Sequence, residues 1–147
     1  LGERLMIGGS WSAYWFNGRI YSSEIARGLD VLRLVPSDQL SAAEIAAAEA
    51  VMEDEINPQT QTRVSWANTP DVAGAYLAQL RRADAIEADL AQQIDAVIEG
   101  WRAGEIDPIA AAAAVASLAV TAETQGVAPL AARRMKALAE VLASAAS

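Results

Sequence analysis

Residues 11–21 read Trp11-Ser-Ala-Tyr-Trp-Phe-Asn-Gly-Arg-Ile-Tyr21 and hold five of the chain's eight aromatic residues. At their centre stands Asn17-Gly18, the dipeptide most favoured in a two-residue β-hairpin, because a type I′ turn needs positive φ at both central positions. The stretch therefore predicts an antiparallel hairpin. Its register would pair Phe16 with Arg19, Trp15 with Ile20, Tyr14 with Tyr21 and Ala13 with Ser22.

Both faces of this hairpin are predicted to be apolar. Successive side chains of a strand point to opposite faces, so Trp15 and Ile20 share one face while Tyr14 and Tyr21 share the other. A sheet with one face in water would alternate apolar with polar residues instead. We therefore expect this sheet to be covered on both sides.

Two further strands are expected around the hairpin. Leu5-Met6-Ile7 forms a plausible short strand, and residues 28–34 form another with Leu and Val on both faces. Pro36 follows the latter strand and has no N–H to donate to a ladder. Residues 1–38 are thus expected to form a three- to four-stranded antiparallel sheet, with a loop from Glu24 to Gly28.

Beyond about residue 40 the chain becomes alanine-rich, acidic and helical, with 32 of its 34 alanines. Ser41-Ala-Ala-Glu44 fits a capping box, in which Ser41 caps a helix and Glu44 bonds back to it. We expect this helix to run to about Asp54 and a linker to follow over residues 55–69. Residues 39–69 would then be a capping helix and linker.

Residues 70–147 are predicted to form a three-helix bundle. Apolar residues recur every three or four positions from Pro70 to about Trp101, which indicates one long helix. A second helix should run from Pro108 to Gly126, and a third should start at Pro129, because Pro is tolerated at the first helical position. Short connections favour antiparallel neighbours. The expected fold class is α+β, an N-terminal sheet followed by a helical tail.

Composition excludes several functional classes. The chain has neither Cys nor His, which removes disulfides, thiol nucleophiles, the commonest general base and the usual zinc ligands. The net charge of −8 falls entirely in residues 41–147, so we expect no nucleic-acid partner. The longest uncharged run, residues 108–122, is too short and too alanine-rich for a membrane span.

Three local motifs are candidates for a metal, catalytic or adhesive site. Glu53-Asp54-Glu55 does not have the spacing of an EF-hand loop, and a solvated helix end explains it better than a Ca²⁺ site. The serines lack a nucleophile elbow or a His partner, and Lys136 is the only lysine. Arg27-Gly28-Leu29-Asp30 is best explained by a tight turn with Asp30 bonded to backbone N–H groups, the alternative being an adhesive or ion-pairing motif. We therefore predict no catalytic residue, no metal and no cofactor.

The aromatic residues are the remaining candidates for a site. Packing between sheets explains most of them, because Tyr and Trp are common where an apolar body is buried and a polar tip finds a partner. Exposed aromatic rings can instead stack on a ligand. The candidate ligand or partner surface is Trp11, Tyr14, Trp15, Tyr21 and Trp66.

Residues 9–34 resemble the closing segment of the LVIVD-repeat proteins, a bacterial and archaeal family of secreted or cell-surface β-propellers. In that family a tyrosine-rich hairpin of the type YNGYIY leads into a strand of the type Ser-Asp-Ile-x-Arg-Gly-Leu-Asp-Val. Residues 16–21 and 23–31 are similar to these motifs. Arg19 and Glu24 depart from them, which puts the hydrogen bonding of the loop in doubt.

The resemblance implies that the sheet is the last blade of a propeller outside the cytoplasm. A single blade cannot bury itself, so the missing blades are expected upstream in the same polypeptide or in another protein chain. The first hypothesis is a non-enzymatic binding or scaffold protein. The alternatives are a propeller enzyme whose active site lies in absent blades, and a self-contained helical domain that forms homo-oligomers through its sheet.

Overall fold

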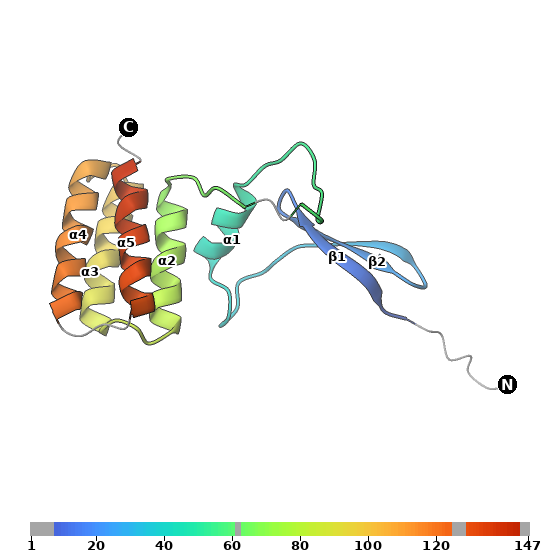
Figure 1. The fold of residues 1–147 in the computed structure, drawn as a ribbon, viewed down its shortest axis with the longest axis horizontal. Helices are drawn as coiled ribbons and strands as arrows, with labels where there is room; N and C mark the ends of the chain where they lie inside the picture. The colour runs from blue at the N-terminus through green and yellow to red at the C-terminus, as the bar shows by residue number, and fades with distance from the viewer. Residues whose placement is uncertain (1–7, 61–62, 125–128, 145–147) are drawn as a thin grey trace.

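The computed structural model describes residues 8–60, 63–124 and 129–144 (Figure 1). A three-stranded sheet comes first and five helices follow, so the α+β prediction is confirmed. The sheet projects from one end of the molecule, the last four helices form the other end, and the first helix lies between them (Figure 1). The elements are β1 (Ser10–Phe16), β2 (Arg19–Glu24), β3 (Gly28–Leu32), α1 (Ala42–Glu49), α2 (Pro70–Arg82), α3 (Ala88–Arg102), α4 (Pro108–Thr124) and α5 (Pro129–Ser144).

The hairpin has the register that its sequence predicts. The strand order is β1-β2-β3, all antiparallel, and each of the four predicted cross-strand pairs is present. Asn17 and Gly18 have φ of 46° and 79°, the positive values that a type I′ turn requires. The predicted strand at residues 5–7 lies outside the described residues, and β3 ends at Leu32 rather than residue 34.

The turn between β2 and β3 is organised by the side chain of Glu24. Its carboxylate accepts hydrogen bonds from the backbone N–H groups of Gly9, Ala26 and Arg27 at 2.6–2.9 Å. These bonds lower the pKa of Glu24 below its ordinary value, and the bond from the Gly9 N–H has the largest effect on that pKa. The expectation for Asp30 was wrong: its carboxylate pairs with the Arg27 guanidinium at 2.8 Å, since that side chain reaches across the turn.

Helix α1 has the predicted capping box but ends earlier than predicted. The Ser41 hydroxyl accepts from the Glu44 N–H at 3.1 Å, and the Glu44 carboxylate accepts from the Ser41 N–H at 2.8 Å. The last helical residue is Glu49, not Asp54. Residues 53–55 are all acidic, and negative charge at a helix C-terminus opposes the helix dipole, which favours an early end.

The long helix predicted over residues 70–101 is wrong, because the chain breaks into α2 and α3. Asp84 has a φ of 48°, in the left-handed region. Its N–H bonds to the carbonyl of Arg81 and the next N–H, that of Ala85, bonds to the carbonyl of Leu80. These two bonds make a Schellman cap, which ends a helix. Asp is among the few residues other than Gly that adopt this conformation without a severe steric cost.

The corner between α3 and α4 repeats this geometry with a glycine. Gly104 has a φ of 74°, and its N–H and that of Glu105 bond back to Trp101 and Gly100. The two corners also align in sequence, Arg-Ala-Asp-Ala-Ile-Glu over residues 82–87 and Arg-Ala-Gly-Glu-Ile-Asp over residues 102–107. The bundle is therefore turned twice by one kind of corner.

Asp84→Gly is expected to raise the free energy of unfolding by about 0.5–1 kcal/mol, because glycine removes the steric cost of the left-handed conformation. The reciprocal control is Gly104→Ala, where a new Cβ would meet no heavy atom within 4 Å and only the backbone is strained. The free energy of unfolding of Gly104→Ala should fall by about 1 kcal/mol. Urea denaturation followed by circular dichroism measures both. A loss of stability in Asp84→Gly would contradict this account of the corner.

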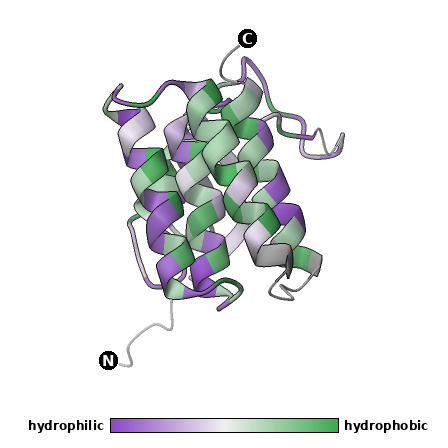
Figure 2. Ribbon diagram, turned by 90° about the vertical axis from the view of Figure 1, so that its left-hand side faces the viewer, coloured by the Kyte–Doolittle hydropathy of each residue, from purple (hydrophilic) through white to green (hydrophobic). Residues whose placement is uncertain are grey.

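The bundle contains four helices rather than the predicted three. Helices α2 to α5 pack in sequence order, and α5 returns to pack against α2, so the four close on one another. Hydrophobic and hydrophilic residues both occur on the outer surface of this bundle (Figure 2). The side chains that are almost completely buried are Leu77, Leu80, Ile94, Ile98, Val115, Met135, Leu138 and Leu142.

The hydrophobic core lies in the helices and not in the sheet. Among the described residues, every buried hydrophobic side chain belongs to α1–α5, and the sheet contributes only the polar Ser22 to the buried set. Helix α1 joins the core by packing Ile45 and Ala47 on α2. A close approach at Gly74 helps, since a Cβ there would lie 3.1 Å from that of Ala43. The helices thus carry the stability, and the sheet is an attachment to them.

Candidate functional site

The five aromatic candidates do not form one surface. The pairing between β1 and β2 shifts between Ser10 and Ser12, so Trp11 is an extra residue without a partner in β2. Such a β-bulge turns its residue out of the regular alternation. Trp11 is accordingly 76% exposed, more than any other large hydrophobic residue that the structure describes. The sequence contains no turn residue at this point that would have revealed the bulge.

Tyr14 and Tyr21 lie on one face of the sheet, directly opposite each other. Phe16 shares this face, and its ring centroid lies 6.5 Å from that of Tyr21 with the planes tilted by 55°. Together with Ile56 and Pro58 these three rings line a shallow hollow. Tyr14 remains 47% exposed, so the other described residues cover this face only in part.

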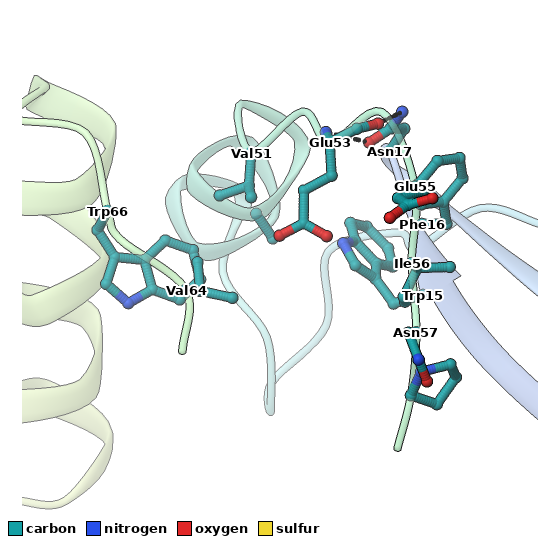
Figure 3. A pocket seen from close by; sticks show the side chains of 12 residues that line it. Trp15, Phe16, Asn17, Val51, Glu53, Glu55, Ile56, Asn57, Val64 and Trp66 are labelled. Carbon is teal, nitrogen blue, oxygen red and sulfur yellow. Dashed lines mark hydrogen bonds between the residues drawn. The ribbon is translucent and has the colours of Figure 1, made fainter. Parts of the chain in front are cut away.

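Trp15 lies on the opposite face, where it and Trp66 line a second space from opposite ends (Figure 3). We call this space the hairpin cleft. It has a volume of about 340 Å³ and lies between the tip of the hairpin, the end of α1 and the segment that follows it (Figure 3). The residues that line it are Trp15, Phe16, Asn17, Ala48, Val51, Glu53, Glu55, Ile56, Asn57, Pro58, Val64 and Trp66.

The side chain of Asn17 holds one wall of the hairpin cleft in place by bonding to the backbone of Glu53. Its Nδ2 donates to the Glu53 carbonyl oxygen at 2.9 Å, and its Oδ1 accepts from the Glu53 N–H at 2.9 Å. The side-chain amide thus pairs with the backbone 36 positions away as a neighbouring strand would. Sequence reasoning assigned Asn17 to the turn alone, and nothing nearby in the sequence indicated its partner.

Asn17→Gly is expected to release the segment after α1 while preserving the turn, since glycine adopts a positive φ freely but has no amide. The measurement is limited trypsin digestion at Arg63, the only basic residue between positions 51 and 69. We expect cleavage to become about fivefold faster, which corresponds to roughly 1 kcal/mol for the two lost bonds. Unchanged cleavage would show that the amide does not hold this segment.

A second candidate surface is the apolar sheet itself. Leu29 and Val31 on β3 share a face with Tyr21 and are 63% and 54% exposed, and Leu32 on the other face is also exposed. Monomeric soluble proteins rarely leave contiguous apolar patches of this kind uncovered, and large ones mark interaction sites. Leu29, Val31 and Leu32 were predicted as strand residues but not as site residues.

Ion pairs attach the sheet to α1 at Glu49. The Glu49 carboxylate lies 3.6 Å from the Arg19 guanidinium and 3.7 Å from that of Arg33. These distances exceed those of hydrogen bonds, and the Oε1 atom of Glu49 is buried without a hydrogen-bond partner. On its other side α1 is held to the end of α2 by Glu44 and Arg82, at 2.6 and 2.9 Å. Helix α1 therefore connects the sheet with the bundle.

Over residues 8–60, 63–124 and 129–144, no three acidic side chains gather closely enough to hold a metal ion. No helix in the same part of the chain is both long enough and apolar enough to cross a membrane.

Comparison with known proteins gave no relative. No family model matches the chain, and neither a curated protein nor a solved structure is significantly similar to it. The resemblance of residues 9–34 to LVIVD-repeat proteins therefore stays a prediction.

Proposed function

We propose that this chain is a non-enzymatic scaffold or binding module whose sheet joins a larger β-structure and whose helices form an appended bundle. The remaining β-structure would be upstream blades of the same polypeptide or another protein chain. The observation that carries the proposal is the separation of core from sheet. Among the described residues every fully buried large apolar side chain lies in a helix, whereas on the strands Tyr14, Leu29 and Val31 are exposed on one face and Leu32 on the other.

Two further observations support it. Among the described residues both β1 and β3 are edge strands, and of the devices that blunt an open edge β3 carries only the charged Asp30, with no Lys, Pro or bulge. The resemblance of residues 9–34 to a closing propeller segment suggests the same arrangement, and an extracytoplasmic location belongs to the proposal only through that resemblance. Face-to-face packing with another sheet would cover Tyr14, Tyr21 and Val31 together.

The test is self-association of the isolated chain, measured by sedimentation velocity over a wide range of concentrations. An uncovered sheet should associate through its apolar faces. The variant Leu29→Thr/Val31→Thr removes apolar surface while keeping a residue that suits strands. The control, Ile109→Thr/Val120→Thr, changes two α4 residues that are 66% and 62% exposed.

We expect the β3 variant to weaken association about tenfold and the α4 control to leave it unchanged, with the same helical circular dichroism in both. Equal effects in the two variants would show non-specific adhesion and contradict the proposal. A strictly monomeric chain whose β3 amides exchange as slowly as those of the bundle would contradict it as well, because the sheet would then need no neighbour. A single dimeric species sensitive to the β3 variant would favour the homo-oligomer alternative.

A further inference from the structure

The hairpin cleft has the dimensions and walls of a small-molecule site. Its volume of about 340 Å³ falls at the lower end of the range of ligand pockets, which are mostly apolar with a few polar groups. Indole rings contribute from two distant segments, Trp15 on β1 and Trp66 before α2. Val51 and Val64 lie between the two indoles in Figure 3, and Ile56 adds a further apolar wall beside Trp15.

The charge of the cleft is negative and not neutralised. Of its lining residues only Glu53 and Glu55 are charged, and no ion pair to either is formed within the described part of the chain. The Glu53 side chain points into the space between the two indoles (Figure 3). Of the nearby cations, Arg19 and Arg33 face Glu49 instead, and Arg63, next to Val64, forms no ion pair with a described residue. An anionic ligand would be repelled here, and a neutral one would gain no charge interaction from the two carboxylates.

Aromatic faces and carboxylates both attract the same kind of ligand. The face of a Trp ring carries negative electrostatic potential, so it binds organic cations, and quaternary ammonium groups suit it because they are weakly hydrated. A carboxylate at the same site adds a direct charge interaction. We propose that the hairpin cleft binds a small organic cation that joins an ammonium group to an apolar body.

This site is separate from the surface proposed for β-sheet docking. Leu29 and Val31 do not line the cleft, and the cleft is built by the hairpin tip, α1, residues 51–58, Val64 and Trp66 of the same chain. The association experiment and a ligand experiment can therefore fail independently of each other.

The probe is benzyltrimethylammonium, titrated into the full chain by isothermal calorimetry. Choline and 3,3-dimethyl-1-butanol serve as competitors, because they have the same shape and differ by one positive charge. We expect saturable binding of the probe, and displacement by choline at concentrations at least about tenfold lower than by the alcohol. Absence of probe binding would overturn the proposal. Equal competition by the alcohol would also overturn it, because the cleft would then bind apolar bodies alone.

The double variant Glu53→Gln/Glu55→Gln tests the carboxylates with the fold preserved, since Asn17 contacts only backbone atoms of Glu53. It should weaken probe binding at least about tenfold. Its control is Glu105→Gln, an exposed acidic residue at the α3–α4 corner. If Glu53→Gln/Glu55→Gln binds like the unmodified chain, the proposed role of the charges is wrong.

Tryptophan variants test the aromatic wall. Trp66→Leu should weaken probe binding, whereas Trp11→Leu should not, because Trp11 lies at the bulge and does not line the cleft. Thermal denaturation of each variant shows whether the fold is retained. Equal losses in the two variants would overturn the assignment of the cation to this cleft.

Discussion

Leu80→Ala is expected to lower the free energy of unfolding by about 3–4 kcal/mol, the largest effect of any substitution considered for this chain. Leu80 lies on α2, has no exposed surface and belongs to the cluster formed by all four helices of the bundle. Truncation removes apolar contacts and leaves a cavity that packed helices cannot close. Urea denaturation monitored by circular dichroism measures the loss.

The matched control is Leu29→Ala on β3, the same chemical change at a side chain that is 63% exposed. It should change the free energy of unfolding by no more than about 0.5 kcal/mol, because no cavity forms. The comparison tests whether the bundle is stable without help from the sheet. A loss at Leu29 as large as that at Leu80 would show that the sheet and bundle unfold as one unit.

Glu44→Gln is expected to cost about 2 kcal/mol at neutral pH. The Arg82 guanidinium bonds to both carboxylate oxygens and the Ser41 N–H adds a third bond, which together hold the pKa of Glu44 at about 2, against an ordinary value of 4.5. The side chain is only 9% exposed, so solvent screens the pair weakly. Gln keeps the shape but loses the charge on which the pKa shift depends.

The sign of the pH dependence follows from the lowered pKa. Stability from Glu44 is fully present above pH 4.5 and is lost as the pH falls toward 2, because the unfolded chain takes up the proton first. The difference between the unmodified chain and Glu44→Gln should therefore disappear across this window. Glu140→Gln is the control, because its pair with Lys136 is exposed and 3.9 Å long. A difference that persists at pH 2 would contradict the assigned role of the charge.

The sheet could be predicted from sequence because its determinants are local. Asn17-Gly18 fixes both the turn type and the register, and the four pairs from Phe16–Arg19 to Ala13–Ser22 follow from that one point, whereas the bulge at Trp11 does not. The capping box at Ser41 was equally predictable from the sequence, since its two hydrogen bonds join residues three positions apart. The fold class followed from these signals and from the contrast between the two parts of the chain.

Prediction from sequence failed where a single residue, or a contact between residues far apart in the chain, decides the structure. Asp84 ends α2 in a conformation usually taken by Gly, and the apolar period continues across the break, so one helix was predicted instead of two. The hairpin cleft depends on the bonds between Asn17 and Glu53, which no periodicity reveals. Trp15 and Trp66 were both named as candidates, but their meeting in one space required the folded chain.

The ion pairs of Glu49 with Arg19 and Arg33 bear on how firmly the sheet is oriented relative to the helices. On the bundle side α1 is packed and hydrogen-bonded, whereas on the sheet side Glu49 lies 3.6 and 3.7 Å from the guanidinium groups of Arg19 and Arg33. Such pairs impose little directional preference. The two hydrogen bonds from Asn17 to the Glu53 backbone are therefore the directional link between hairpin and helices, so Asn17→Gly should let the bundle change its angle to a partner bound on the strands.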